Sequence, residues 1–194
     1  MGILHGVVAT VGRALRKARA GEDKLAAKRL NAIGTPTIDV TSPAFKAGGA
    51  IPRRYATQGA NVSPPLKFRG IPREAEEIVV LCEDPDAPLF RPFAHWIVTG
   101  ISPSVTELPE GLEEGPVLSS LPGARQGKNT KRRVAYDGPS PPAGHGEHRY
   151  HFQVFALNRP LPTSEIPIDR EELVEQLRDR VIGFGEIVGV YQKP

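Results

Sequence analysis

Short runs of apolar and β-branched residues recur along most of the chain, and segments rich in Gly, Pro, Asn and Ser separate them. Runs of this length, bounded by turn residues, predict β-strands. The strands expected from the pattern are 37–40, 78–82, 96–101, 133–136, 150–157 and 187–191. We therefore expect a mainly β fold in which two antiparallel sheets pack face to face.

Helical spacing of apolar residues near the C-terminus predicts one late helix, over residues 169–181. Leu173, Leu177 and Val181 form its apolar stripe. Asp169 is a suitable N-cap, with Glu172 three residues further on. This C-terminal helix is the only clear helix in the body of the chain.

The first part of the chain predicts a basic amphipathic helix over residues 3–30. Its apolar positions recur at helical spacing: Ile3, Leu4, Val7, Val8, Val11 and Leu15. Gly6, Gly12 and Gly21 weaken the helix and favour a break. Two interpretations remain open, because the stripe could pack on this domain or on a second copy, or it could bind a membrane surface or a partner. We favour packing, with Leu4, Val8, Val11 and Leu15 buried, and divide the chain into an N-terminal extension, 1–34, and a β domain, 35–194.

Charge is distributed unevenly along the chain. The net charge is +3, but residues 1–31 hold seven Lys/Arg and two Asp/Glu and therefore carry +5, which leaves −2 for the remainder. A nucleic-acid-binding domain would carry its basic residues on the folded body, so we expect no nucleic-acid partner. Cys82 is the only cysteine and ends an apolar run, which favours a buried thiol in a reducing, cytoplasmic setting. No stretch has the length of a membrane span, and the first residues lack the features of a secretory signal.

The stretch 78–98 combines two apolar runs with a stiff, polar loop between them. The loop carries Asp84, Asp86 and Pro88, and His95 follows just before the second run. Proline fixes the backbone, so this loop is suited to hold binding groups in place. We also expect the Arg91–Pro92 bond to be cis, because the chain must reverse between strands while it aims His95 inward.

A second polar segment runs from residue 136 to residue 150. A loop rich in Gly and Pro, which includes Gly138, leads into the strand 150–157. The alternation of side chains along a strand places His148 and Tyr150 on one face and His151 on the other. His148 and Tyr150 should therefore look toward whatever the loop surrounds.

Together these segments resemble signatures of the phosphatidylethanolamine-binding protein family, also called Raf kinase inhibitor-like, in its bacterial and archaeal form. The first reads Asp84-Pro85-Asp86-Ala87-Pro88 followed by His95-Trp96, and the second reads Gly138, Pro141, Pro142, Gly144 and then His148-Arg149-Tyr150. The segment Asn61-Val62-Ser63-Pro64-Pro65-Leu66 is also similar to a segment of that family. The resemblance implies a two-sheet Greek-key fold with a small anion-binding pocket.

By position, the resemblance implies a set of ligand-binding residues: Asp84, Asp86, Pro88, His95, Gly138, His148 and Tyr150. Pro139 and Ser140 depart from the family pattern, and Pro139 has no N–H to donate to an anion. We expect the two aspartates to orient His95 and His148 and to keep both rings protonated. The expected ligand is a phosphate-like anion or a phospholipid headgroup.

The favoured function is therefore that of a non-catalytic, regulatory or inhibitory binding protein with no cofactor. A hydrolase is the alternative, with Asp84, Asp86, His95 and His148 as metal ligands or as acid and base. Against it, neither segment holds a Ser or Cys nucleophile or a short metalloenzyme motif. An inhibitor of a kinase or a protease, acting through a surface segment, is the other alternative.

Overall fold

The computed structural model describes residues 17–35 and 37–193. Its larger sheet has five antiparallel strands in the order β6-β4-β3-β7-β8. The long apolar runs form its central strands, whose side chains are buried on both faces of the sheet. The bounds are β3 Glu77–Asp84, β4 Phe93–Ile101, β6 Arg125–Gln126, β7 His148–Leu157 and β8 Val181–Tyr191.

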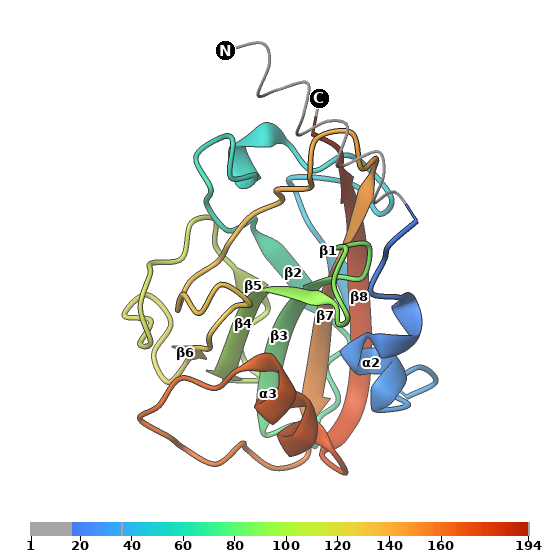
Figure 1. Ribbon diagram of the computed structural model, residues 1–194. Coiled ribbons are helices and arrows are strands. Elements are labelled where there is room, and N and C mark those ends of the chain that lie inside the picture. The colour runs from blue at the N-terminus through green and yellow to red at the C-terminus, as the bar shows by residue number, and fades with distance from the viewer. Residues whose placement is uncertain (1–16, 36, 194) are drawn as a thin grey trace.

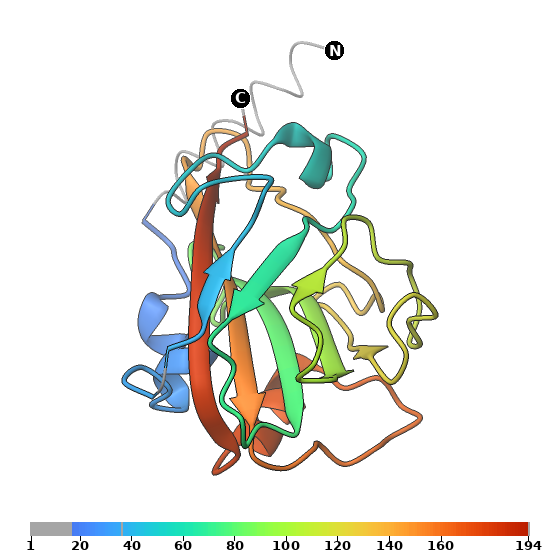
Figure 2. The same ribbon diagram turned by 180° about the vertical axis from the view of Figure 1, so that it is seen from behind.

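A smaller antiparallel sheet covers one face of the larger sheet, as Figure 2 shows. Its strand order is β1-β2-β5, with bounds β1 Asp39–Thr41, β2 Leu66–Arg69 and β5 Glu107–Leu108. The layer between the sheets holds large buried side chains, including Phe68, Trp96 and Phe152. Cys82 is buried in this layer, as expected. The prediction of a mainly β protein with two packed sheets is confirmed.

Helices cover the opposite face of the larger sheet (Figure 1). They are the short α2, Ala26–Arg29, and α3, Arg170–Leu177. Ala26 and Ala27 of α2 and Leu173 of α3 lie in one apolar cluster with side chains from β3, β4 and β7. The Asp169 carboxylate accepts hydrogen bonds from the N–H groups of Glu171 and Glu172, so Asp169 is the N-cap that the sequence predicts.

Both helix predictions were too long. The C-terminal helix ends at Leu177, Asp179 has a positive φ of 57°, and Val181 starts β8 instead of ending the helix. In the N-terminal region, residues 1–16 lie outside the described residues, together with the predicted burial of Leu4, Val8, Val11 and Leu15. After them, Gly21 has φ 102°, which no helix accommodates. Between Gly21 and residue 30, where the predicted helix was to end, the chain forms the 3₁₀ turn η1, Glu22–Lys24, and the short helix α2.

Three of the expected strands match β3, β4 and β7 closely, while others were misplaced. Residues 133–136 form no strand, and the strand expected at 187–191 begins at Val181. The pattern also missed the short strands β2, β5 and β6, and the 3₁₀ turn η2, Arg53–Tyr55. Two-residue strands are too short to produce an alternating pattern, so their neighbours rather than their sequence determine them.

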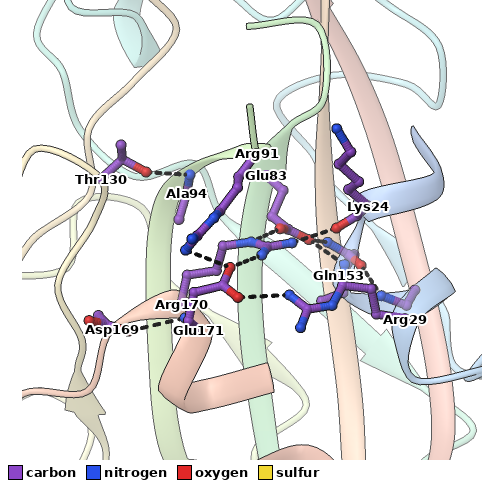
Figure 3. Close-up of polar contacts among 12 residues, drawn as sticks. Lys24, Arg29, Glu83, Arg91, Ala94, Thr130, Gln153, Asp169, Arg170 and Glu171 are labelled. Carbon is purple, nitrogen blue, oxygen red and sulfur yellow. Dashed lines mark hydrogen bonds and ion pairs between the residues drawn. The ribbon is translucent and has the colours of Figure 1, made fainter. Parts of the chain in front are cut away.

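A buried polar network joins the helices to the sheet (Figure 3). The Glu83 carboxylate on β3 accepts hydrogen bonds from the Ala26 N–H at 2.8 Å, from Gln153 Nε2 at 2.6 Å and from Arg170 Nε at 2.5 Å. Arg170 also donates to the carbonyl oxygen of Lys24 at 2.6 Å. These contacts fix α2 and α3 on β3 and β7.

Within the described ranges, 17–35 and 37–193, no helix has both the length and the apolar character that a membrane crossing requires.

Candidate functional site: a pocket at the end of the larger sheet

The β3–β4 hairpin is shaped by Asp84, the last residue of β3. One oxygen of its carboxylate accepts hydrogen bonds from the backbone N–H groups of Asp86, at 2.7 Å, and Ala87, at 3.1 Å. An aspartate that binds the backbone two residues further on forms a local turn. The loop therefore reverses direction through the side chain of Asp84.

The expected cis bond at Arg91–Pro92 is wrong, because the structure contains no cis peptide bond in the part of the chain it describes. The hairpin does not need one. The turn at Asp84 starts the reversal, and six further residues separate Asp86 from Phe93, where β4 begins. This length lets the chain return with every bond trans.

His95 occupies a β-bulge in β4. Cys82 pairs with Trp96 and Glu83 pairs with Ala94, so two residues of β3 face three residues of β4 and His95 has no partner of its own. A bulge changes the direction of the side chain it carries. It places His95 at the pocket, where its Nδ1 hydrogen-bonds to the carbonyl oxygen of Asp137.

His148 and Tyr150 lie at the start of β7, both buried, on the side predicted from strand alternation. His148 Nδ1 lies 2.7 Å from the Asp84 carboxylate, and its Nε2 lies 2.7 Å from Nδ1 of His145. Both ring nitrogens of His148 therefore have protein partners. The Tyr150 ring packs edge-on against His95, with 5.1 Å between ring centroids.

These groups surround a pocket of about 260 Å³ with mixed polar and apolar walls. The lining residues are Asp84, Ala87, Pro88, Leu89, Phe93, His95, Lys131, Asp137, Ser140, Pro141, Pro142 and His148. Asp84, Pro88, His95 and His148 thus meet as the sequence predicts. Tyr150 lies directly behind His95, whereas Asp86 and Gly138 do not line the pocket.

Asp86 binds arginines instead of a histidine. Its carboxylate accepts hydrogen bonds from the backbone N–H of Arg149 at 2.9 Å and from the Arg149 guanidinium at 2.8 and 2.6 Å, and it pairs with Arg19. The expectation that Asp86 orients His95 or His148 is therefore wrong. Ala20 and Gly21 donate backbone hydrogen bonds to the carbonyls of Ala87 and Pro85, so the segment after residue 16 is fastened to the outside of the pocket loop.

Gly138 has a packing role. Its N–H donates to the side-chain oxygen of Asn61 at 2.8 Å, so this group is already engaged within the protein. A Cβ at this position would lie 2.0 Å from the carbonyl oxygen of Tyr55, a distance at which the backbone must move. Only glycine fits here, and it holds the loop 136–142 against the turn η2.

Comparisons with known proteins match the sequence and the fold of this chain to one family. Residues 41–192 match the model of a family described as phosphatidylethanolamine-binding protein. The chain belongs to the phosphatidylethanolamine-binding protein family. A UPF0098 protein of Pyrococcus abyssi is 41% identical over 143 residues, which cover 74% of this chain and 79% of that protein.

Solved structures of family members support the same assignment. YbcL from Escherichia coli, described as a member of the mammalian PEBP family, has a TM-score of 0.75 and 30% identity, over 81% of this chain and 99% of that one. The homologue CT736 from Chlamydia trachomatis has a TM-score of 0.72 and 36% identity, over 82% of this chain and 100% of that one. The sequence resemblance to the family, and the fold it implied, are confirmed.

Two pocket residues of this family member were missed in the sequence. Lys131 lines the pocket, where its ammonium lies 2.7 Å from the Asp137 carboxylate and 6.0 Å from the centre of the Phe93 ring. Asp137 holds His95 through its carbonyl oxygen. Asp137 directly precedes Gly138 in the second family motif, and this position was a usable signal. The polar run around Lys131 has no feature that distinguishes it from an ordinary exposed loop.

Burial shifts the pKa of two groups beside this family pocket, His95 and Tyr150. The pKa of His95 is lowered, chiefly because burial penalises the charged ring, although the neighbouring Asp84 carboxylate acts in the opposite direction. The pKa of His95 thus moves opposite to the expectation that the aspartates keep the ring protonated. Burial also raises the pKa of Tyr150 far above its usual range, so its hydroxyl keeps its proton.

The structure gives no support to a metal site in this family member. In residues 17–35 and 37–193, no three His, Cys, Asp or Glu side chains gather as a metal ion requires. His148 is held between Asp84 and His145, and Asp86 is held by Arg149. Three of the four candidate ligands of the hydrolase alternative, Asp84, Asp86 and His148, therefore have other partners.

Proposed function

We propose that this protein binds a small phosphate-like anion in the pocket beside His95 and acts as a regulatory binding protein without catalysis. The supporting observation is the convergence of His95, Lys131 and the Asp84–His148 pair on one pocket of about 260 Å³. This volume suits a phosphoryl group with a short substituent. Apolar walls around a few fixed polar groups are typical of small-ligand sites.

Each polar group has a defined part in this proposal. The Lys131 ammonium supplies the positive charge that attracts the anion, and the neighbouring ring of Phe93 supports it. The Asp84 carboxylate fixes the loop through Asp86 and Ala87 and orients His148. Asp84 thus shapes the pocket, and we expect this structural role to outweigh the repulsion between its carboxylate and a bound anion.

Calorimetric titration with methyl phosphate tests this function. The variants Asp84→Ala and His148→Ala are expected to weaken binding, because each breaks the pair that shapes the pocket. Lys131→Gln is expected to weaken binding about tenfold, on the scale of one charge-assisted hydrogen bond. Lys67→Gln is the matched control, because Lys67 is an exposed lysine on β2 that pairs only with Glu107 in the described structure. Equal affinity of the Lys131 and Lys67 variants, or no binding by the unmodified protein, would contradict the proposal.

A further inference from the structure

Two polar atoms beside the pocket are buried and have no hydrogen-bond partner among the described residues. They are Nε2 of His95 and the hydroxyl of Tyr150. His95 is 4% exposed and Tyr150 is 1% exposed, and their rings are in contact. Buried polar atoms in proteins nearly always have a partner, and one left without a partner costs free energy. His95 lines the pocket and Tyr150 lies behind it, so Nε2 of His95 is the atom available to a ligand in the pocket.

The hydrogen bonds of His95 define what Nε2 can do. Nδ1 faces the carbonyl oxygen of Asp137, which can only accept, so Nδ1 carries the hydrogen. In the neutral ring that burial favours, Nε2 then presents a lone pair. The pocket wall consequently offers a hydrogen-bond acceptor at the place where a group that donates a hydrogen bond to an anion is expected.

The charges around His95 strengthen this point. On β3, a carboxylate oxygen of Asp84 lies 4.0 Å from Nε2 of His95. On the loop before β7, Asp137 is paired with Lys131. On β7, His148 has both ring nitrogens engaged, and Tyr150 contributes an uncharged hydroxyl. An anion without a hydrogen, placed against Nε2, would meet a lone pair with a carboxylate close by.

We propose that the pocket selects an oxyacid that carries one proton, namely the monoanion of a phosphate monoester, over a phosphate diester. This inference rests on the proposed function and specifies its ligand. The P–OH group donates to Nε2 of His95. A remaining oxygen faces the ammonium of Lys131. A phospholipid whose phosphate carries a headgroup alcohol is a diester and has no P–OH group, so it lacks the group that matches Nε2.

Ligand pairs test the inference on the unmodified protein. Methyl phosphate can carry a P–OH, dimethyl phosphate cannot, and glycerophosphoethanolamine is a diester that adds an ammonium. Calorimetry at pH 5.5 should show methyl phosphate binding at least about tenfold more tightly than either diester, which is the scale of one buried acceptor left unsatisfied. Above the second pKa of a phosphate monoester, about 6, its affinity should fall toward that of dimethyl phosphate.

The outcomes separate this inference from the function on which it rests. Equal or tighter binding of dimethyl phosphate overturns the inference, since the histidine ring would then supply the proton, and leaves anion binding in place. Equal or tighter binding of glycerophosphoethanolamine also overturns it, since an ammonium would then be the donor. If none of the three compounds binds, the proposed function itself fails.

Two variants sharpen the result. His95→Phe keeps a ring but has no acceptor, so the preference for methyl phosphate over dimethyl phosphate should drop to about one. Lys131→Gln should weaken both esters by the same factor and keep their ratio, because the Lys131 ammonium interacts with charge and not with the P–OH. A ratio that survives His95→Phe in a protein with a normal melting curve would contradict the assignment of Nε2 as the acceptor.

Discussion

Glu83 and Asp84 are consecutive residues of β3, both buried, and their carboxylates point to opposite faces of the larger sheet. Glu83 faces the helices, where Ala26, Gln153 and Arg170 donate to it. Asp84 faces the pocket, where it binds two backbone N–H groups and His148. The two carboxylates therefore have similar numbers of partners but different surroundings.

The difference lies in where each network ends. Around Glu83 the network closes within the protein, since Arg170 goes on to the Lys24 carbonyl and Gln153 accepts from the Ala27 N–H. Next to Asp84 the polar groups end at His95 Nε2 and the Tyr150 hydroxyl, which have no partner in the described structure. A closed buried network indicates a structural role, whereas an open one indicates a place for a ligand.

The largest expected effect comes from breaking the closed network. Arg170→Met leaves the Glu83 carboxylate buried without its cation, so the free energy of unfolding should fall by about 3–5 kcal/mol. Urea denaturation measures this change. Arg29→Met is the matched control, because Arg29 pairs with the partly exposed Glu171 and should cost less than about 1 kcal/mol. Similar losses for both variants would show that the Glu83 network is no stronger than a surface ion pair.

The next effect concerns the open network and pH. Because the pKa of His95 is lowered on folding, the unfolded chain binds a proton more readily than the folded protein. The contribution of His95 to stability is therefore full above its unfolded pKa of about 6.5 and is lost as the pH falls below it. Urea denaturation from pH 7.5 to 5, in buffers without phosphate, should show a steeper decline for the unmodified protein than for His95→Gln. Parallel curves would refute a lowered pKa at His95.

The smallest effect compares two buried tyrosines. The hydroxyl of Tyr136 donates to the Tyr55 carbonyl at 3.0 Å, whereas that of Tyr150 has no partner among the described residues. Tyr136→Phe should lower the free energy of unfolding by about 0.5–1.5 kcal/mol, and Tyr150→Phe should leave it unchanged or raise it slightly. Thermal denaturation of the two variants side by side provides the measurement. A larger loss for Tyr150→Phe would mean that its hydroxyl has a structural partner after all.

The sequence predicted the parts of the fold that depend on long apolar runs. β3, β4 and β7 each carry enough apolar residues to be recognised without their neighbours. The run 133–136 looks similar, yet its backbone carbonyls accept hydrogen bonds from groups outside any sheet. The donors are the backbone and side chain of Asn129 and the N–H of Gly115. The apolar pattern of the run cannot show this, because the competing hydrogen bonds come from residues outside it.

The candidate site was predictable for those motif residues whose side chains line the pocket. Asp84, His95 and His148 line the pocket as expected, and their family signatures made them visible. Asp86 was misassigned because its partners, Arg19 and Arg149, come from a segment far away in sequence and from the strand β7. The lowered pKa of His95 was missed for a related reason, since burial depends on packing that no motif specifies.

The bulge at His95 has a consequence for how the site relates to the sheet. Ala94 packs toward the helices and Trp96 toward the smaller sheet, so these two residues would alternate correctly if they were adjacent in the chain. Their partners on β3, Glu83 and Cys82, are adjacent already. The part of the ladder from Val80 to Asp84 of β3 would thus be regular in a chain one residue shorter, without His95. His95 is thus an inserted residue in this part of the hairpin, and its hydrogen bonds are with the loop 136–142 through Asp137 rather than with β3.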